Sequence, residues 1–193
     1  MNPPDVDPES FNEIKHLLDK ILAEQIPSRS QPSRFPMLNS LLTVEDIEEG
    51  KAHVEEHLKS SACGADKITY EKVLALDNEL LCVFLNECIR TRQIPYMGLE
   101  SCLLKFLTLL IHLRIYKVLE ENNLIPASQN GFRSKFQTNN NAFILRTLID
   151  KAMAEGDTLF VVFLDISNAF PSADHSFLWL RMQTLGLTGI YFD

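Results

Sequence analysis

The sequence predicts a mainly helical α+β fold. Apolar residues recur at helical spacing through most of residues 9–155, and one short continuous apolar run, Thr158–Ile166, has the composition of a strand buried on both faces. The chain has 193 residues, which is enough for one modest domain with its own core. We therefore expect a small sheet with helical cover.

The first expected region, residues 1–42, joins a helix to a linker. Residues 9–24 have the apolar spacing of an amphipathic helix. Residues 26–36 contain three prolines and three serines, which is typical of an extended segment.

The second expected region, residues 43–95, is a helical extension. Thr43 and Asp46 have the spacing of a capping box and predict the start of a helix running toward Lys59. Residues 60–66 predict a loop. Two further helices are expected over residues 69–76 and 78–92.

The third expected region, residues 96–193, contains the predicted strand. Gly156 is placed to end the helix that precedes it. The elements expected here are helices over residues 99–121, 139–155 and 176–185 and the strand over 158–166.

The charge is unevenly distributed. The formal net charge of −8 argues against a chain that simply coats nucleic acid. Residues 1–100 have a net charge of −8 (10 basic, 18 acidic), residues 101–151 of +4 (7 basic, 3 acidic) and residues 152–193 of −4 (1 basic, 5 acidic). A phosphate-binding surface is thus expected in the middle segment, with an ordinary solvated helix face as the alternative.

Cysteine spacing and the N-terminus indicate an intracellular protein, cytoplasmic or nuclear, without a membrane segment. The four cysteines form no C-x-x-C pair and are expected to be free thiols: Cys63, Cys82, Cys88 and Cys102. The N-terminus has no signal-peptide pattern, and the most apolar stretch, residues 102–113, is too short to span a bilayer.

Asp165 is the residue with the clearest chemical implication. It follows six apolar residues, Leu159–Leu164, where an ionised carboxylate is costly unless it is paired or binds a cation. A carboxylate at a rigid strand end can hold Mg²⁺ in two-metal nucleotidyl transfer, with the carbonyl of Ile166 as a further oxygen ligand. Ala169 and Phe170 could form the floor under a nucleotide sugar. The alternative is an aspartate that caps the turn before Pro171.

Two linked blocks resemble a known family. FLDISNAFPSADH, residues 163–175, resembles the first catalytic box of non-LTR retrotransposon reverse transcriptases. The segment before it resembles the preceding family block through Gln129, Gly131, Phe132, Arg133 and Thr138. Further upstream, SACGADKI resembles the family's Gly-x-Asp-Gly-Ile signature, with Lys67 where glycine is usual, and LLCVFLNECIRTRQIP resembles the helix that follows it. The resemblance runs from about Thr43 to the end.

The resemblance implies part of the fingers and palm of a reverse transcriptase with an N-terminal helical extension. The family reaction is RNA-templated DNA synthesis with Mg²⁺, so an RNA template and a DNA primer would be the partners. By this likeness Asp165 would be the first metal-binding aspartate and Ile166 would contribute its carbonyl. Ala169 and Phe170 would contact the nucleotide, Phe170 as the gate against a ribose 2′-hydroxyl. Arg133 and Lys135 would face nucleic acid, although a structural salt bridge is the alternative for Arg133.

Two departures from the family lead us to expect no activity from this chain alone. Only Tyr96 and Met97 stand where the family has a long stretch that builds the triphosphate-gripping hairpin. The sequence also contains no Tyr-x-Asp-Asp box, so one carboxylate in a matched box is expected to bind Mg²⁺ weakly. Asp174 is an acidic position that we expect to be structural. The chain could be a genomic remnant, a mis-spliced product or a fragment.

Two other functions compete with this interpretation. His53-x-x-Glu56-His57 matches a zinc motif whose histidines share one helix face, although a solvated acidic face explains it too. A non-catalytic interaction module or degenerate remnant is the second, and it would self-associate through its incomplete sheet without any response to metal.

Overall fold

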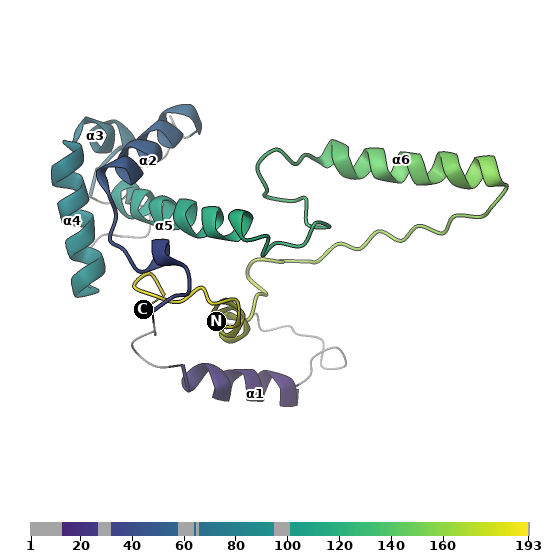
Figure 1. Ribbon diagram of the computed structural model, residues 1–193, viewed down its shortest axis with the longest axis horizontal. Coiled ribbons are helices and arrows are strands. Elements are labelled where there is room, and N and C mark those ends of the chain that lie inside the picture. Colours follow the sequence, from purple (N-terminus) through teal and green to yellow (C-terminus); the bar gives the residue numbers. More distant parts are fainter. Residues whose placement is uncertain (1–12, 27–31, 58–63, 65, 95–100, 193) are drawn as a thin grey trace. The chain divides into compact units, whose positions relative to one another are not determined.

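The computed structural model describes residues 13–26, 32–57, 64, 66–94 and 101–192, and these residues are mainly helical (Figure 1). They fall into two compact units, each considered by itself. The core unit comprises residues 5–122 and 174–193, and the insert unit comprises residues 1–4 and 123–173.

The core unit holds six α-helices among its described residues, with one short 3₁₀-helix before the second. These elements are α1 (Glu13–Glu24), η1 (Pro36–Leu38), α2 (Val44–His57), α3 (Tyr70–Ala75), α4 (Asn78–Thr91), α5 (Cys102–Glu121) and α7 (His175–Thr184). The insert unit holds α6 (Thr138–Glu155). These bounds confirm the helices expected from the sequence to within a few residues.

Side chains cap the starts of α2 and α4, and the cap of α2 is the one that the sequence predicts. The capping box at α2 is formed: the Asp46 carboxylate accepts from the Thr43 N–H at 2.6 Å, and the Thr43 hydroxyl accepts from the Asp46 N–H at 3.3 Å. Asp77 caps α4 by accepting from the Leu80 N–H at 2.9 Å. Such bonds satisfy donors that the first helical turn leaves unpaired.

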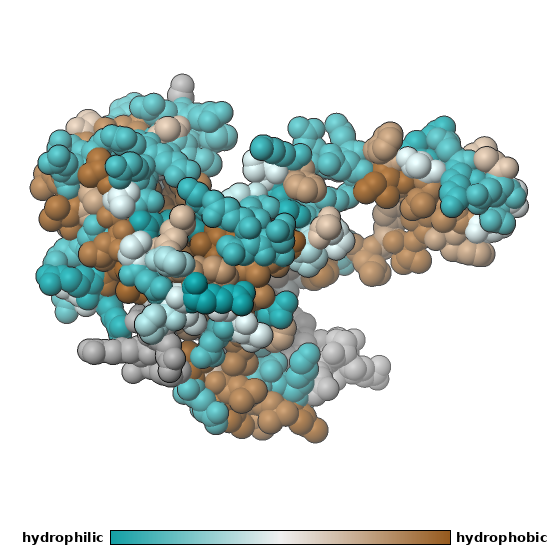
Figure 2. Space-filling view, in the orientation of Figure 1, coloured by the Kyte–Doolittle hydropathy of each residue, from teal (hydrophilic) through white to brown (hydrophobic). Residues whose placement is uncertain are grey.

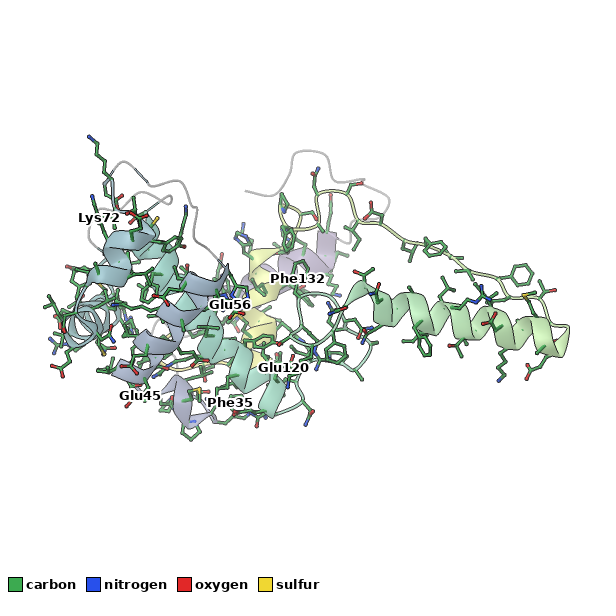
Figure 3. The ribbon with its side chains drawn as sticks, turned by 90° about the horizontal axis from the view of Figure 1, so that it is seen from above. Phe35, Glu45, Glu56, Lys72, Glu120 and Phe132 are labelled. Atoms are coloured by element: carbon green, nitrogen blue, oxygen red, sulfur yellow. The ribbon has the colours of Figure 1, made fainter. Side chains whose placement is uncertain are left out.

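The hydrophobic core lies where α2 packs with α4 and α5 and where α3 packs with α5 (Figure 3). Gly50 lets α2 approach α5 closely, because a β-carbon there would collide with Leu110 and crowd Phe106. Phe106 is completely buried, and Leu110 almost so. The other members of the core are Leu42, Ile47, Val54, Tyr70, Val73, Leu81, Cys82, Leu85, Cys102, Leu103 and Leu107.

α1 and α7 pack against each other within the core unit. His16 Nδ1 lies 2.6 Å from Asp174 Oδ2, and the Lys15 ammonium lies 5.7 Å from the centre of the Phe177 ring. The sequence segment from Gly189 onward returns to η1, where the Ile190 N–H donates to the Leu38 carbonyl at 3.2 Å. These contacts join the C-terminal segment of the core unit, from Asp174 onward, to its N-terminal elements α1 and η1.

The insert unit contains a loop, a helix and an extended segment. The chain turns at Gly156, whose φ of +70° is the left-handed conformation expected at a helix C-terminus, and then runs back in the direction opposite to α6 (Figure 1). α6 has no buried residue. The unit therefore has little core of its own.

The predicted strand over Thr158–Ile166 is not formed. Residues 157–166 are extended without regular secondary structure, and no strand occurs among the described residues. A strand needs ladder hydrogen bonds to a neighbour, and the described parts of the chain supply none. The α+β expectation is therefore met only in its mainly helical character.

Some expectations lie outside the described residues. They concern parts of the first helix and of the linker, the end of the 43–59 helix with Lys59, most of the 60–66 loop with Cys63, and Tyr96–Met97. In the described chain, no helix has the length and apolarity needed to cross a bilayer.

Candidate functional site

Asp165 lies at the end of the extended segment and is exposed. The apolar run before it is exposed too: Phe160, Val162 and Leu164 are 89%, 80% and 91% accessible. The predicted cost of burying a carboxylate next to an apolar run therefore does not arise here. Ile166, whose backbone carbonyl is the further oxygen ligand expected for Mg²⁺, is likewise 71% exposed.

A tight turn follows Asp165 and positions Phe170. The Asn168 carbonyl accepts from the Ser172 N–H at 2.9 Å, and the Phe170 carbonyl accepts from the Ala173 N–H at 3.2 Å. Asn168 has a φ of +50°, which asparagine tolerates better than most residues. The hydrogen bonds of the turn thus run from Asn168 to Ala173 and include Phe170.

Asp174 has the structural role expected for it. It is the N-cap of α7, and its carboxylate accepts from the Ser176 N–H at 2.8 Å. Burial raises the pKa of Asp174, but the hydrogen bonds from His16 and from the backbone of Ser176 and Phe177 outweigh that effect and lower it overall.

The loop from residue 126 to 137 is organised around Arg133. Its guanidinium donates to the carbonyls of Pro126 at 3.3 Å and Gln129 at 3.2 Å, and stacks 4.4 Å from the centre of the Phe136 ring. Arg133 thus makes structural contacts within its own loop, and the salt bridge considered as its alternative stays a prediction. Lys135 is exposed, with a φ of +67°.

The structure brings one residue of the upstream block to the predicted nucleotide floor. The rings of Phe132 and Phe170 meet edge to face, with centroids 5.9 Å apart. Both rings are exposed, at 90% and 78% (Figure 3, where Phe132 is labelled). The expectation that Arg133 and Lys135 face nucleic acid stays a prediction.

A pocket that the sequence analysis missed lies in the same loop. It has a volume of about 350 Å³ and contains none of the six predicted site residues. It is lined by Asn130, Gly131, Phe132, Phe136, Gln137, Thr138 and Asn141. The run Gln137–Asn141, with four amide side chains in five residues, was the signal that could have indicated it.

Lys67, which stands where the resembled signature has glycine, has a left-handed backbone conformation. Its φ is +55°, in the left-handed region where glycine is the usual residue. The neighbouring Asp66 accepts from the Ile68 N–H at 3.1 Å.

The zinc motif is not supported by a complete ligand set. His53 and His57 do share one face of α2, and their rings stack with centroids 4.5 Å apart. However, no group of three histidine, cysteine or acidic side chains suited to a metal occurs in the part of the chain that the structure describes. Stacked imidazoles on a helix with an acidic surface fit the alternative of a solvated face.

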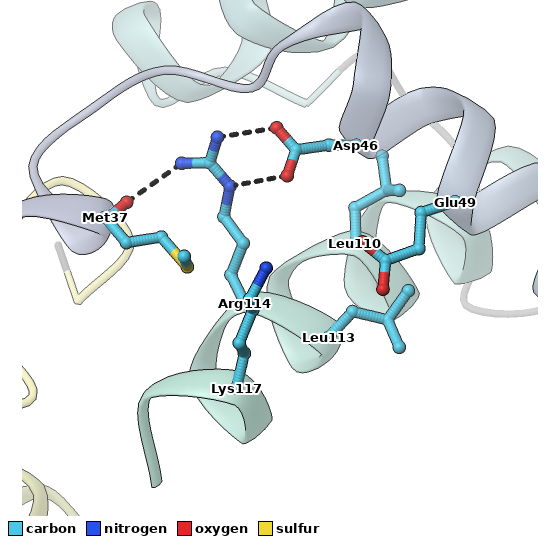
Figure 4. Close-up of a pocket in the computed structure, with 7 residues that line it drawn as sticks. All are labelled: Met37, Asp46, Glu49, Leu110, Leu113, Arg114 and Lys117. Carbon is cyan, nitrogen blue, oxygen red and sulfur yellow. Dashed lines mark hydrogen bonds and ion pairs between the residues drawn. The ribbon is translucent and has the colours of Figure 1, made fainter. Parts of the chain in front are cut away.

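A buried polar cluster around Arg114 is structural and lies in the core unit. Arg114 is 5% exposed and forms an ion pair with Asp46, 2.6 Å from Nη2 to Oδ2 (Figure 4). It also donates to the carbonyls of Met37, Ser40 and Leu41 and to the hydroxyl of Tyr191. Only a cavity of about 30 Å³ remains beside it.

The three described cysteines are buried and are not joined in disulfides, as expected: Cys82, Cys88 and Cys102. Burial raises the pKa of the Cys82 and Cys88 thiols, which makes them poor nucleophiles. They are therefore part of the core and not a reactive site.

The chain matches no protein family, no curated protein and no solved structure.

Proposed function

We propose that the chain is part of an RNA-directed DNA polymerase of a non-LTR retroelement and that Asp165 is its first metal-binding carboxylate. The observation that carries the proposal is the order and spacing of the two blocks: Gln129 to Thr138, then a helix, then an apolar extended run that ends at Asp165, then Ala169 and Phe170. The Phe132–Phe170 contact and the left-handed backbone of Lys67 support it.

The described residues supply only part of a magnesium site. Asp165 offers a carboxylate and Ile166 a carbonyl, but Mg²⁺ requires near-octahedral oxygen ligands and gives up its water reluctantly. No cluster of three acidic or histidine ligands occurs among the described residues. The chain is therefore proposed to contribute one metal-binding carboxylate and a nucleic-acid-binding surface. By itself the chain is proposed to have no polymerase activity.

The test measures binding of an RNA template annealed to a DNA primer, by fluorescence anisotropy at several salt concentrations. Arg133→Gln with Lys135→Asn removes two cations, and asparagine suits the positive φ of residue 135. We expect weaker binding. The slope of the logarithm of the binding constant against the logarithm of the salt concentration should fall in magnitude by about 1–2, because each lost phosphate contact means about one fewer counterion released on binding.

The matched control removes two cations elsewhere in the insert unit. Arg146 and Lys151 are exposed on α6, where each pairs with an acid four residues on. Arg146→Gln with Lys151→Gln should leave the salt slope almost unchanged. Equal losses in both double variants, or no template binding at all, would contradict the proposal.

Primer extension with Mg²⁺ or Mn²⁺ tests the inactivity. Incorporation by the intact chain should not exceed that of Asp165→Ala. Incorporation that disappears in this variant would show that another carboxylate completes the site, and would keep the polymerase assignment while overturning the inactivity.

A non-catalytic interaction module is the second candidate. The exposed apolar run at Phe160, Val162 and Leu164 favours it, because extended apolar segments with unpaired backbone readily pair with another strand. If the chain is an interaction module, replacing Asp165 should change neither its binding nor any other measured activity.

A further inference from the structure

We propose that the pocket between the 130–137 loop and the first turn of α6 binds one base of single-stranded RNA. The inference rests on the proposed function, because it assigns a nucleic-acid contact to a chain of that class. It concerns residues that the family likeness did not assign: Asn130, Phe136, Gln137 and Asn141.

The size of the pocket suits a ligand as small as a nucleoside. Its volume of about 350 Å³ is near the lower end of the range of about 300–1,000 Å³ for small-molecule sites. The pocket lies wholly within the insert unit. A folded domain or a helix would not fit into it, whereas a single extruded base would.

The lining combines flat apolar faces with groups that both donate and accept hydrogen bonds. Phe132 and Phe136 supply aromatic rings, and Asn130, Gln137 and Asn141 supply side-chain amides. Single-stranded RNA is recognised by stacking of bases on aromatic rings and by hydrogen bonds to their exposed edges. An amide suits such an edge because it presents one acceptor and two donors side by side.

Internal contacts hold these groups in place before a ligand arrives. The Asn130 Nδ2 donates to Asn141 Oδ1, which joins the loop to α6 and leaves the Asn130 acceptor and the Asn141 donors for a ligand. The Arg133 guanidinium covers Phe136, which is half-buried. Gln137, the N-cap residue of α6, makes no capping hydrogen bond with its side chain.

The local charge favours a nucleic acid over a peptide or an uncharged small molecule. Residues 122–145 contain two cations, Arg133 and Lys135, and no carboxylate. The first turn of α6 adds the partial positive charge of a helix N-terminus. Phosphates on either side of a bound base would therefore meet a favourable potential.

The experiment uses the intact chain and an unstructured single-stranded RNA of about 12 nucleotides, within the usual range of single-strand site sizes. Asn141→Ala removes one amide of the pocket, and Gln137→Ala removes another without touching the Asn130–Asn141 bond. Asn139→Ala is the matched control, because Asn139 lies in the same turn of α6, is exposed and does not line the pocket.

We expect each pocket variant to weaken RNA binding about fivefold or more, which is the low end for a base contact made by an amide. The Asn139→Ala chain should bind as the unaltered chain does. An RNA of the same length with abasic sites throughout should bind the unaltered chain more weakly, and its affinity should not fall further in Asn141→Ala. Cross-linking of a 4-thiouridine RNA should map to Phe132 or Phe136.

Failure of this inference differs from failure of the proposed function. If Asn141→Ala and Gln137→Ala bind RNA as Asn139→Ala does, or if abasic RNA binds equally well, the base pocket is wrong. The dependence on Arg133 and Lys135 would still stand in that case. If no RNA binds to the unaltered chain, both fail together.

Discussion

Arg114 shows how one residue can hold distant parts of the core unit together. A buried guanidinium is tolerated only when its donors are satisfied, and here they are shared among Asp46, three carbonyls and Tyr191. These partners lie before α2, at its start and near the chain's last residue. The side chain thus fixes the segment around η1 against α5.

Removing this guanidinium should destabilise the chain strongly. Arg114→Ala leaves the Asp46 carboxylate without its charged partner and the Leu41 carbonyl without the guanidinium donor, so we expect a loss of about 3–5 kcal/mol in the free energy of unfolding. Urea denaturation followed by circular dichroism measures it. Arg90→Ala, which breaks the exposed pair with Glu87, should cost about 0.5 kcal/mol. Similar losses for both would contradict the structural role of Arg114.

The ion pair between Arg114 and Asp46 should make the free energy of unfolding depend on pH. Burial raises the pKa of Asp46, but hydrogen bonds from Arg114 and Thr43 and the charge of Arg114 outweigh it and lower the pKa overall. Since the folded pKa lies below the unfolded one, the contribution is complete above the unfolded pKa of about 3.9 and is lost as pH falls through the folded value.

Comparison with Asp46→Asn isolates this effect from the other carboxylates. The unaltered chain should be the more stable at neutral pH, and the difference in unfolding free energy should shrink below about pH 4. A difference that stays constant down to the acid limit would mean that Asp46 is not stabilised in its charged form.

At the scale of single residues, the sequence predicts what depends on near neighbours. The Thr43–Asp46 capping box and the helix stop at Gly156 follow from spacings of a few residues, and both are formed. The roles of Arg114 and of the amide pocket depend on residues brought together by folding. No local pattern distinguishes Arg114 from an exposed arginine on a helix.

At the scale of elements, the helices were predictable and the strand was not. A helix satisfies its own backbone, so apolar spacing and caps are enough to place it. A strand is completed by a partner, and residues 157–166 have the strand composition without one. Asp165 is consequently placed at the end of an extended segment and not at the end of a ladder.

α6 should be much less stable than α5, although their lengths are similar. α5 buries seven residues and α6 buries none, and a helix without tertiary packing is marginal in water. In hydrogen exchange followed by mass spectrometry, amides of α6 should exchange at least about 100-fold faster than those of α5. Equal protection would mean that α6 packs against a surface that its exposed residues do not suggest.

At the scale of the whole molecule, apolar burial is concentrated in the core unit. The buried apolar residues all lie in the core unit, as far as the chain is described. The insert unit instead exposes apolar side chains on α6 and on the extended segment (Figure 2). They include Phe143, Ile144, Met153, Phe160, Val162 and Leu164.

This exposed apolar surface should make the chain self-associate as its concentration rises. Extended, uncharged apolar runs with unpaired backbone pair readily with copies of themselves. Phe160→Glu with Val162→Glu should reduce the self-association because it places charges in the run. The melting temperature should change little, because both side chains are already exposed. Sedimentation velocity over a range of concentrations measures the effect.

The matched control also replaces two exposed apolar residues by glutamate, but on the core unit. Leu80 and Val83 of α4 are 64% and 68% exposed. Leu80→Glu with Val83→Glu should self-associate as the unaltered chain does, because a helix satisfies its own backbone hydrogen bonds and offers no edge for pairing. If both double variants reduce association equally, general surface hydrophobicity is the cause and the extended segment has no special part. If the unaltered chain stays monomeric at every concentration, its apolar run is not free to pair with another copy.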